Sequence, residues 1–297
     1  LAYSWRLKIL SQDFFSWKKS IELIFIWEFA SAISPTSLGG SATAMIFLAQ
    51  ENLKSAKVVT IILYSVVLDT LYFLVYLLIM LVVMGSIIIH PTVDYIWDFN
   101  GYSLTFWIIY LIMFSYGFLI YYGLFINPRH ISRFLNWLST RKFLRKFKMN
   151  LGETAADIIH ASSELKNKST AFHMSAFISS GIAWFLRFSV IPLLIFAISP
   201  AVNPGFYDFI LMNVRSTTLF IITAFSPTPG SSGVAEVFLG EFFSDYIKNT
   251  TATVIAIVWR VLTYYTYLIA GIIIVPFWIQ RIIKKRKKRK KINSLID

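Results

Sequence analysis

The chain has 297 residues, of which 57% are hydrophobic and only 14% are charged, and its mean hydropathy is +0.65. These values exclude an ordinary soluble domain and indicate a polytopic membrane protein. The net charge of +13 is better explained by membrane topology and attraction to anionic lipid than by nucleic acid, so we expect no nucleic-acid partner.

The first 50 residues predict an interfacial segment followed by a hairpin. Residues 1–20 mix Trp and Phe with Lys and Arg, which is typical of a segment lying at a membrane interface. Residues 21–33 are apolar but too short to span, and they are followed by SPTSLGGSATA at 34–44 and a second apolar piece ending near Gln50. The sequence leaves open whether further helices precede Leu1.

Four long apolar segments predict the transmembrane helices: 58–84, 103–126, 174–198 and 251–275. Each is close to the roughly 20 residues that span hydrocarbon. The alternating segments of a β-barrel are absent from the sequence. We therefore expect an all-α protein with about four long transmembrane helices and two shorter hairpins. A single integral-membrane domain is predicted over 1–280, with a basic tail at 281–297.

The region 127–173 is basic and carries apolar residues at helical spacing. One interpretation is an amphipathic helix on anionic headgroups, and the other is a solvated basic linker. This region and the tail are rich in Lys and Arg, whereas 85–101 and 199–213 have none. The positive-inside rule therefore predicts a multi-pass cell-membrane protein with 127–173 and the tail in the cytoplasm.

This topology requires 206–247 to enter and leave the membrane on the external side, as a re-entrant pair or as two short spans. The hairpin at 21–50 then enters from the cytoplasm, in the opposite orientation. Each carries a Ser-Pro-Thr turn followed by glycine and serine, and a charge lies in the next long helix: Asp69 follows Pro35 by 34 positions and Arg260 follows Pro227 by 33. An inverted repeat with broken helices is typical of transporters, although loop chemistry alone also favours such short strings.

The two turns are candidate ligand sites because backbone at membrane depth must line a cavity or pack within protein. A helix that begins after Gly233 would direct its free N–H groups at an anion. The alternative is that these small residues only permit close helix packing. The candidates in the turns are Pro35, Thr36, Gly39, Gly40, Ser41, Pro227, Thr228, Pro229, Gly230, Ser231, Ser232 and Gly233.

Charged residues within the apolar segments are the other candidates. Asp69, Arg187 and Arg260 lie in long helices, where a charge usually faces a partner or water. The arginines are suited to phosphate, with Asp69 pairing one of them in the empty state, and the alternative is a fixed structural ion pair. Glu236 is expected to cap the following helix, and the alternative is that it meets a cationic head group or a basic side chain. Glu28 and Arg215 are weaker candidates, and the aromatic residues around Arg260 are expected to be packing or interface residues.

The stretches SPTPGSSGVAEVFLGEFF (226–243) and IAIVWRVLTYYTYLIAGI (255–272) resemble the lysylphosphatidylglycerol synthetase transmembrane, or flippase-like, family. Pro229, Gly230, Gly233, Glu236 and Arg260 fall on its motif. The resemblance implies a membrane protein that moves lipids between leaflets: anionic or aminoacylated phospholipids, or polyprenyl-linked lipids. The first hairpin lacks the arginine and glutamate common in that region of the family, so the cargo cannot be carried over.

Three functions remain open. The first is a lipid flippase or translocase, which is not an enzyme and needs no metal or cofactor, in keeping with the absence of cysteine and of histidines at ligand spacing. The second is an intramembrane enzyme acting on a lipid phosphate, with Asp69 and a serine. The third is a non-transporting partner of a lipid-modifying enzyme. A homo-oligomer is also possible.

Overall fold

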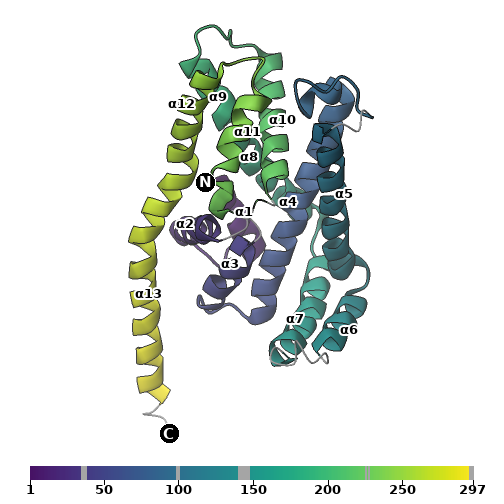
Figure 1. Cartoon of the computed structure of the whole chain (residues 1–297). Coiled ribbons are helices and arrows are strands. Elements are labelled where there is room, and N and C mark those ends of the chain that lie inside the picture. Colours follow the sequence, from purple (N-terminus) through teal and green to yellow (C-terminus); the bar gives the residue numbers. More distant parts are fainter. Residues whose placement is uncertain (35–38, 98–100, 140–147, 225, 227, 294–297) are drawn as a thin grey trace.

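The computed structural model describes residues 1–34, 39–97, 101–139, 148–224, 226 and 228–293, and within these every regular element is a helix (Figure 1). The α-helices are α1 (Ala2–Ser11), α2 (Trp17–Ile33), α3 (Gly39–Ala49), α4 (Ser55–Met84), α5 (Gly101–Tyr121), α6 (Pro128–Ser139), α7 (Lys148–Lys166), α8 (Thr170–Phe188), α9 (Val190–Ile198), α10 (Phe206–Thr223), α11 (Val234–Phe242), α12 (Asn249–Arg260) and α13 (Thr266–Asn293). Short 3₁₀ helices lie at η1 (Gly85–Ile88) and η4 (Pro229–Ser231), and π-helical turns at η2 (Tyr122–Ile126) and η5 (Val261–Tyr265).

Four helical stretches in the described chain are long and apolar enough to cross a membrane: Ser55–Ile88, Gly101–Ile126, Thr170–Ile198 and Asn249–Lys287. They coincide with the four predicted spans, and the all-α polytopic architecture is confirmed. The third span bends at Ser189, where Pro192 cannot donate a backbone hydrogen bond to the preceding turn. The fourth widens into a π turn directly after Arg260 and continues to Asn293, so the predicted boundary at 280/281 lies inside a helix.

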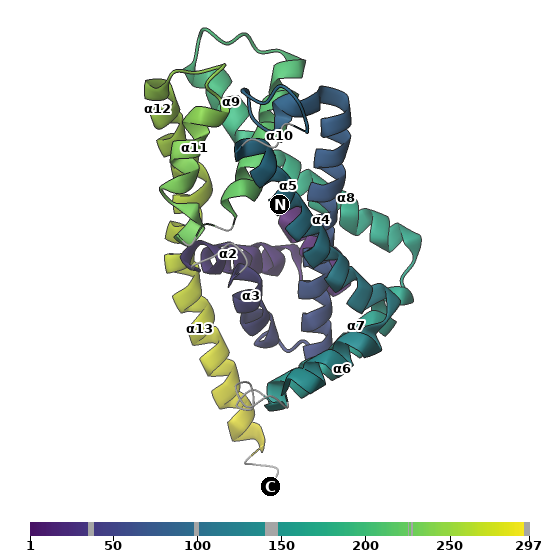
Figure 2. The same cartoon turned by 45° about the vertical axis from the view of Figure 1, so that its right-hand side comes forward.

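The shorter helices form two pairs at the predicted positions. α2 packs on α3, and α10 packs on α11. In Figures 1 and 2 the α2–α3 pair lies below the α10–α11 pair, with α2 near the middle of the molecule. The pairs meet near the middle, where η4 contacts α2 and the Tyr264 hydroxyl donates to the Ala32 carbonyl at 3.1 Å. Their relation as an inverted repeat stays a prediction.

The N-terminal helix lies inside the protein, contrary to the predicted interfacial segment. α1 packs against α8, α2 and α4, and Leu7 and Leu10 are each 2% exposed. Arg6 is equally enclosed at 6% exposure. The segment contains aromatic and basic residues because α1 contributes a charged side chain to the interior, while Leu1 before the helix and Phe14 and Trp17 after it are exposed.

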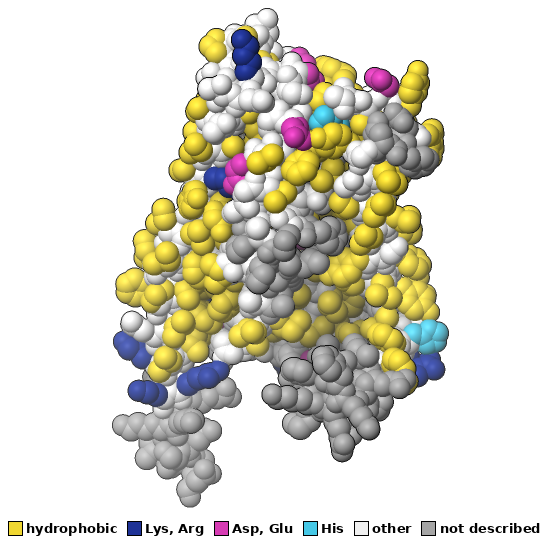
Figure 3. Space-filling model, viewed as in Figure 1, with side chains coloured by type: hydrophobic (Ala, Val, Ile, Leu, Met, Phe, Trp, Pro, Cys, Tyr) yellow, Lys and Arg dark blue, Asp and Glu magenta, His cyan; other side chains and the backbone are white. Residues whose placement is uncertain are grey.

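The described part of the basic region 127–173 includes α6 and α7, which differ in character. α6 exposes Phe134 and Trp137 on its surface, as an amphipathic helix would. α7 instead packs on α4 and α6, with Ile158, Ala161 and Leu165 buried. In Figure 3 most of the visible Lys and Arg side chains lie along the lower edge, and most of the visible Asp and Glu side chains lie in the upper half.

Candidate functional site

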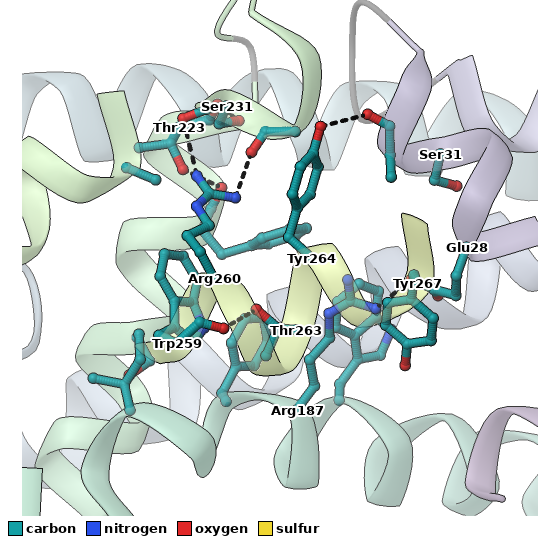
Figure 4. Close-up of a pocket in the computed structure, with 18 of the residues that line it drawn as sticks. Glu28, Ser31, Arg187, Thr223, Ser231, Trp259, Arg260, Thr263, Tyr264 and Tyr267 are labelled. Carbon is teal, nitrogen blue, oxygen red and sulfur yellow. Dashed lines mark hydrogen bonds and ion pairs between the residues drawn. The ribbon is translucent and has the colours of Figure 1, made fainter. Parts of the chain in front are cut away.

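A cavity of about 210 Å³ lies where the two helix pairs meet (Figure 4). α1, α2, α4, α8 and α10 contribute to its walls, together with the turn at η4 and the junction between α12 and α13. Its charged lining consists of Arg6, Glu28, Asp69, Arg187 and Arg260. Charges are costly at membrane depth, and side chains that carry them face partners or an aqueous cavity.

Arg260 forms hydrogen bonds that hold the turn between α10 and α11 in place. Its Nε donates to Glu236 Oε1 at 2.6 Å, and its Nη1 and Nη2 donate to the carbonyls of Gly230 and Ser231 at 2.8 and 3.2 Å. The Arg260 side chain is only 9% exposed, and its Cζ lies 4.7 Å from the centroid of the Trp259 ring. One side chain therefore satisfies two backbone acceptors that lipid could not satisfy.

The composition of the turn follows from its backbone. Gly230 and Gly233 have φ of +58° and +85°, a region that favours glycine. A Cβ on Gly230 would lie 2.4 Å from Tyr264 Cε2, so the close approach also requires glycine. Ser231 donates to the Thr223 carbonyl at 2.7 Å, and Glu236 accepts from the Gly233 N–H at 2.8 Å. The predicted capping role of Glu236 is confirmed, and the same carboxylate also pairs with Arg260.

The second charged pair joins α8 to α2. Arg187 Nη1 donates to Glu28 Oε2 at 2.9 Å, and the guanidinium lies 5.5 Å from the Trp184 ring. In the view of Figure 4, Tyr264 stands between this pair and Arg260. The arginines thus line one cavity, each with a carboxylate partner.

The third pair was not predicted. Asp69 accepts from Arg6 of α1 and from Trp184 Nε1, the latter at 2.6 Å. The predicted pairing of Asp69 with Arg187 or Arg260 is therefore wrong, because Glu28 and Glu236 already occupy those arginines. The three pairs together balance three positive and three negative charges around the cavity.

The structure brings part of the predicted set together. Asp69, Arg187, Gly230, Ser231 and Arg260 line the cavity, and Glu236 reaches it through Arg260. Gly40, Thr228, Ser232 and Gly233 are not among its lining residues. A Cβ on Gly40 would lie 1.8 Å from Ser31 Oγ, so this glycine permits close packing of α2 and α3. Pro35, Thr36 and Pro227 lie outside the described residues, as do the side chains of Ser41 and Pro229 and the surroundings of Gly39.

Sequence reasoning missed several lining residues. Arg6 had been placed at the interface, and Glu28 was only a weak candidate. Trp259, Tyr264 and Tyr267 line the cavity, although they were predicted to be packing or interface residues. A buried carboxylate such as Asp69 needs a cationic partner, because an unpaired buried charge is costly. This need was the signal that could have pointed to Arg6.

Arg215 is completely buried and belongs to a separate cluster. Its Nη1 lies 2.7 Å from both carboxylate oxygens of Asp245, and its Nε donates to the Ile87 carbonyl at 2.8 Å. The nearby His90 ring stacks on Tyr102 with centroids 3.8 Å apart. Burial lowers the pKa of His90, and the Arg215 guanidinium lowers it further, which favours neutral imidazole. This cluster links η1 to α10 and α11 outside the cavity.

Comparison with known proteins gives a family match over most of the chain. The protein-family model described as "Lysylphosphatidylglycerol synthase TM region" matches residues 1–271. A "UPF0104 membrane protein" from Archaeoglobus fulgidus is 24% identical over 287 residues, covering 93% of this chain and 82% of that protein. No solved structure matches the chain.

Proposed function

Because the chain belongs to the lysylphosphatidylglycerol synthase transmembrane-region family, we propose that it moves a phospholipid or polyprenyl-type lipid between leaflets of the cell membrane. The head group would enter the charged cavity while the hydrocarbon tails remain in the bilayer. The observation that carries this proposal is the cavity itself, in which three arginine–carboxylate pairs surround the meeting point of two helix pairs.

The chemistry of the pairs supports a phosphate-bearing cargo. Guanidinium binds carboxylate and phosphate with the same bidentate geometry, so a lipid phosphate can take the place of a protein carboxylate. The released carboxylate would then be free for a cationic group on the cargo or on the protein. Such an exchange keeps charges compensated at membrane depth.

We propose transport without catalysis by this chain. An intramembrane enzyme would use Asp69 as a base next to a nucleophilic serine. Asp69 Oδ1 instead accepts from the Arg6 guanidinium and from the Trp184 indole N–H, and these two contacts hold the carboxylate in a fixed position between α1 and α8.

The test is lipid exchange in proteoliposomes that contain a phospholipid labelled on its acyl chain. A reductant added outside bleaches only the outer leaflet of protein-free vesicles, whereas the active protein is expected to expose the inner-leaflet label. Bleaching that stops at the outer leaflet for every phospholipid and polyprenyl phosphate tried would contradict the proposal. Mass spectrometry of the recovered lipid checks that its head group is chemically unchanged.

We also propose that the lower end of the molecule, with α6 and the basic end of α13, faces the cytoplasm. The chain has no cysteine, so Asn203→Cys and Lys287→Cys each introduce a single thiol. Both positions are exposed, and in Figure 1 the connection from α9 to α10 and the C-terminal end of α13, which carry them, lie at opposite ends of the molecule. We expect a membrane-impermeant maleimide to label residue 203 in intact cells and residue 287 only after permeabilisation. Labelling of both in intact cells would contradict this orientation.

A further inference from the structure

A second cavity, of about 630 Å³, opens between α4, α5 and α8. Its walls are almost entirely apolar and include Leu71 and Leu74 of α4, Phe118 and Tyr121 of α5, and Met174 of α8. All three helices belong to candidate membrane spans, so the medium outside the opening is hydrocarbon. It shares no lining residue with the charged cavity. We refer to it as the lateral groove.

The length of the lateral groove along α4 is close to the thickness of the hydrocarbon of one leaflet. Along α4 it extends from Tyr64 to Leu74, which at 1.5 Å per residue is about 15 Å, or half of a hydrocarbon core of about 30 Å. Within the groove α4 and α5 approach closely, since a Cβ on Gly117 would lie 2.4 Å from Thr70 Cγ2. The volume of about 630 Å³ is many times the roughly 30 Å³ that one water molecule occupies in the liquid, so the groove has room for an extended hydrocarbon chain.

One end of the lateral groove is polar and positively charged. Tyr64 and His173 Nδ1 form a hydrogen bond of 2.5 Å there, and Phe172 stacks on Tyr64. Lys168 lies 5.8 Å from the Phe172 ring. On the α5 side, Tyr122 bonds to His130 Nδ1 at 2.9 Å, which places the start of α6 at the same end.

The α6 side adds further positive charge, since Arg129 and Arg133 of this helix are exposed. In Figure 3 a His and a Lys or Arg side chain border the lower right edge of the apolar surface. Cations at the interfacial end of an apolar groove are suited to an anionic head group.

We propose that the lateral groove binds an anionic phospholipid, with one acyl chain between α4, α5 and α8 and the phosphate near Lys168 and Arg129. The bound lipid comes from the leaflet on the α6 side. This site is separate from the charged cavity. The proposal that it binds a lipid does not depend on the proposal that the protein transports lipids.

The test is native mass spectrometry of the full chain in detergent with equimolar phosphatidylglycerol and phosphatidylcholine of equal chain length. We expect one phosphatidylglycerol to be retained, with a preference of at least about tenfold from three nearby cations. Two variants separate the two halves of the site. Leu71→Trp with Met174→Trp fills the groove and should lower binding of both lipids at least about tenfold. Arg129→Gln with Arg133→Gln and Lys168→Gln should retain a bound lipid and lose the preference.

The matched controls change similar side chains elsewhere. Ile269→Trp with Ile272→Trp alters exposed positions on α13, and Lys284→Gln with Lys285→Gln and Lys287→Gln removes three charges from its basic end. Both controls should bind as the unaltered chain does. Equal binding of both lipids with no effect of groove filling would overturn the proposal, as would a dimer that the tryptophans dissociate. If the filled variant fails to fold, the charge variant, which leaves the apolar walls intact, still decides the case.

Discussion

Replacing Arg260 with alanine is expected to abolish lipid exchange while leaving membrane insertion intact. Arg260 holds the Gly230 and Ser231 carbonyls and Glu236, and it supplies the guanidinium proposed to receive a lipid phosphate. Truncating one partner of a buried, hydrogen-bonded charge pair costs about 2–5 kcal/mol, so the exchange rate should fall at least about 30-fold. The measurement is the initial rate of inner-leaflet bleaching in proteoliposomes.

Two further variants serve as a matched control and as a conservative replacement. Arg281→Ala removes an arginine of α13 that pairs with Glu22 and is 54% exposed, far along the helix from the cavity, and it should leave exchange within about twofold. Arg260→Lys retains the charge but lacks the fork that reaches three acceptors, so partial activity at most is expected. Exchange at the unaltered rate in Arg260→Ala would remove this arginine from the transport site.

Replacing Arg6 with glutamine should destabilise the fold more than replacing Lys8, the other charged residue of α1. The substitution leaves Asp69 enclosed without a cation, and breaking a buried pair costs about 3–5 kcal/mol. Asp69→Asn should cost a similar amount because it strands Arg6. The double variant should be more stable than either single one. The measurement is the midpoint temperature of thermal unfolding in detergent for the two single variants and the double variant. Size-exclusion chromatography monitors the fraction of protein that stays folded.

The control is the Lys8–Asp13 pair in the same region. Lys8 Nζ lies 2.7 Å from Asp13 Oδ1, and although the Lys8 side chain is 16% exposed, that of Asp13 is 80% exposed. Lys8→Gln therefore leaves no enclosed charge without a partner and should cost less than about 1 kcal/mol. If Arg6→Gln is no more harmful than Lys8→Gln, the Arg6–Asp69 pair does not hold α1 in the interior. Additive effects in the double variant would show that the two side chains are not coupled.

The spans were predictable because the thickness of hydrocarbon fixes the length of an apolar helix. The positions of the two helix pairs followed from charge asymmetry and from prolines that interrupt apolar runs. The partners of the buried charges were not predictable. Arg187 and Glu28 are 159 positions apart, and nothing local in either segment specifies the other. Arg6 was misplaced for a related reason: a short helix with Trp, Lys and Arg has the same composition at an interface as in a charged interior.

The compensation of charge around the cavity has an electrical consequence. A membrane potential acts on net charge that crosses the field, at about 2.3 kcal/mol per elementary charge and 100 mV. Each arginine of the cavity has its own counter-ion, so rearranging an arginine together with its carboxylate moves almost no net charge. Any voltage dependence of transport should then reflect the valence of the lipid that is carried, and the sign of that dependence would identify a cationic or an anionic cargo.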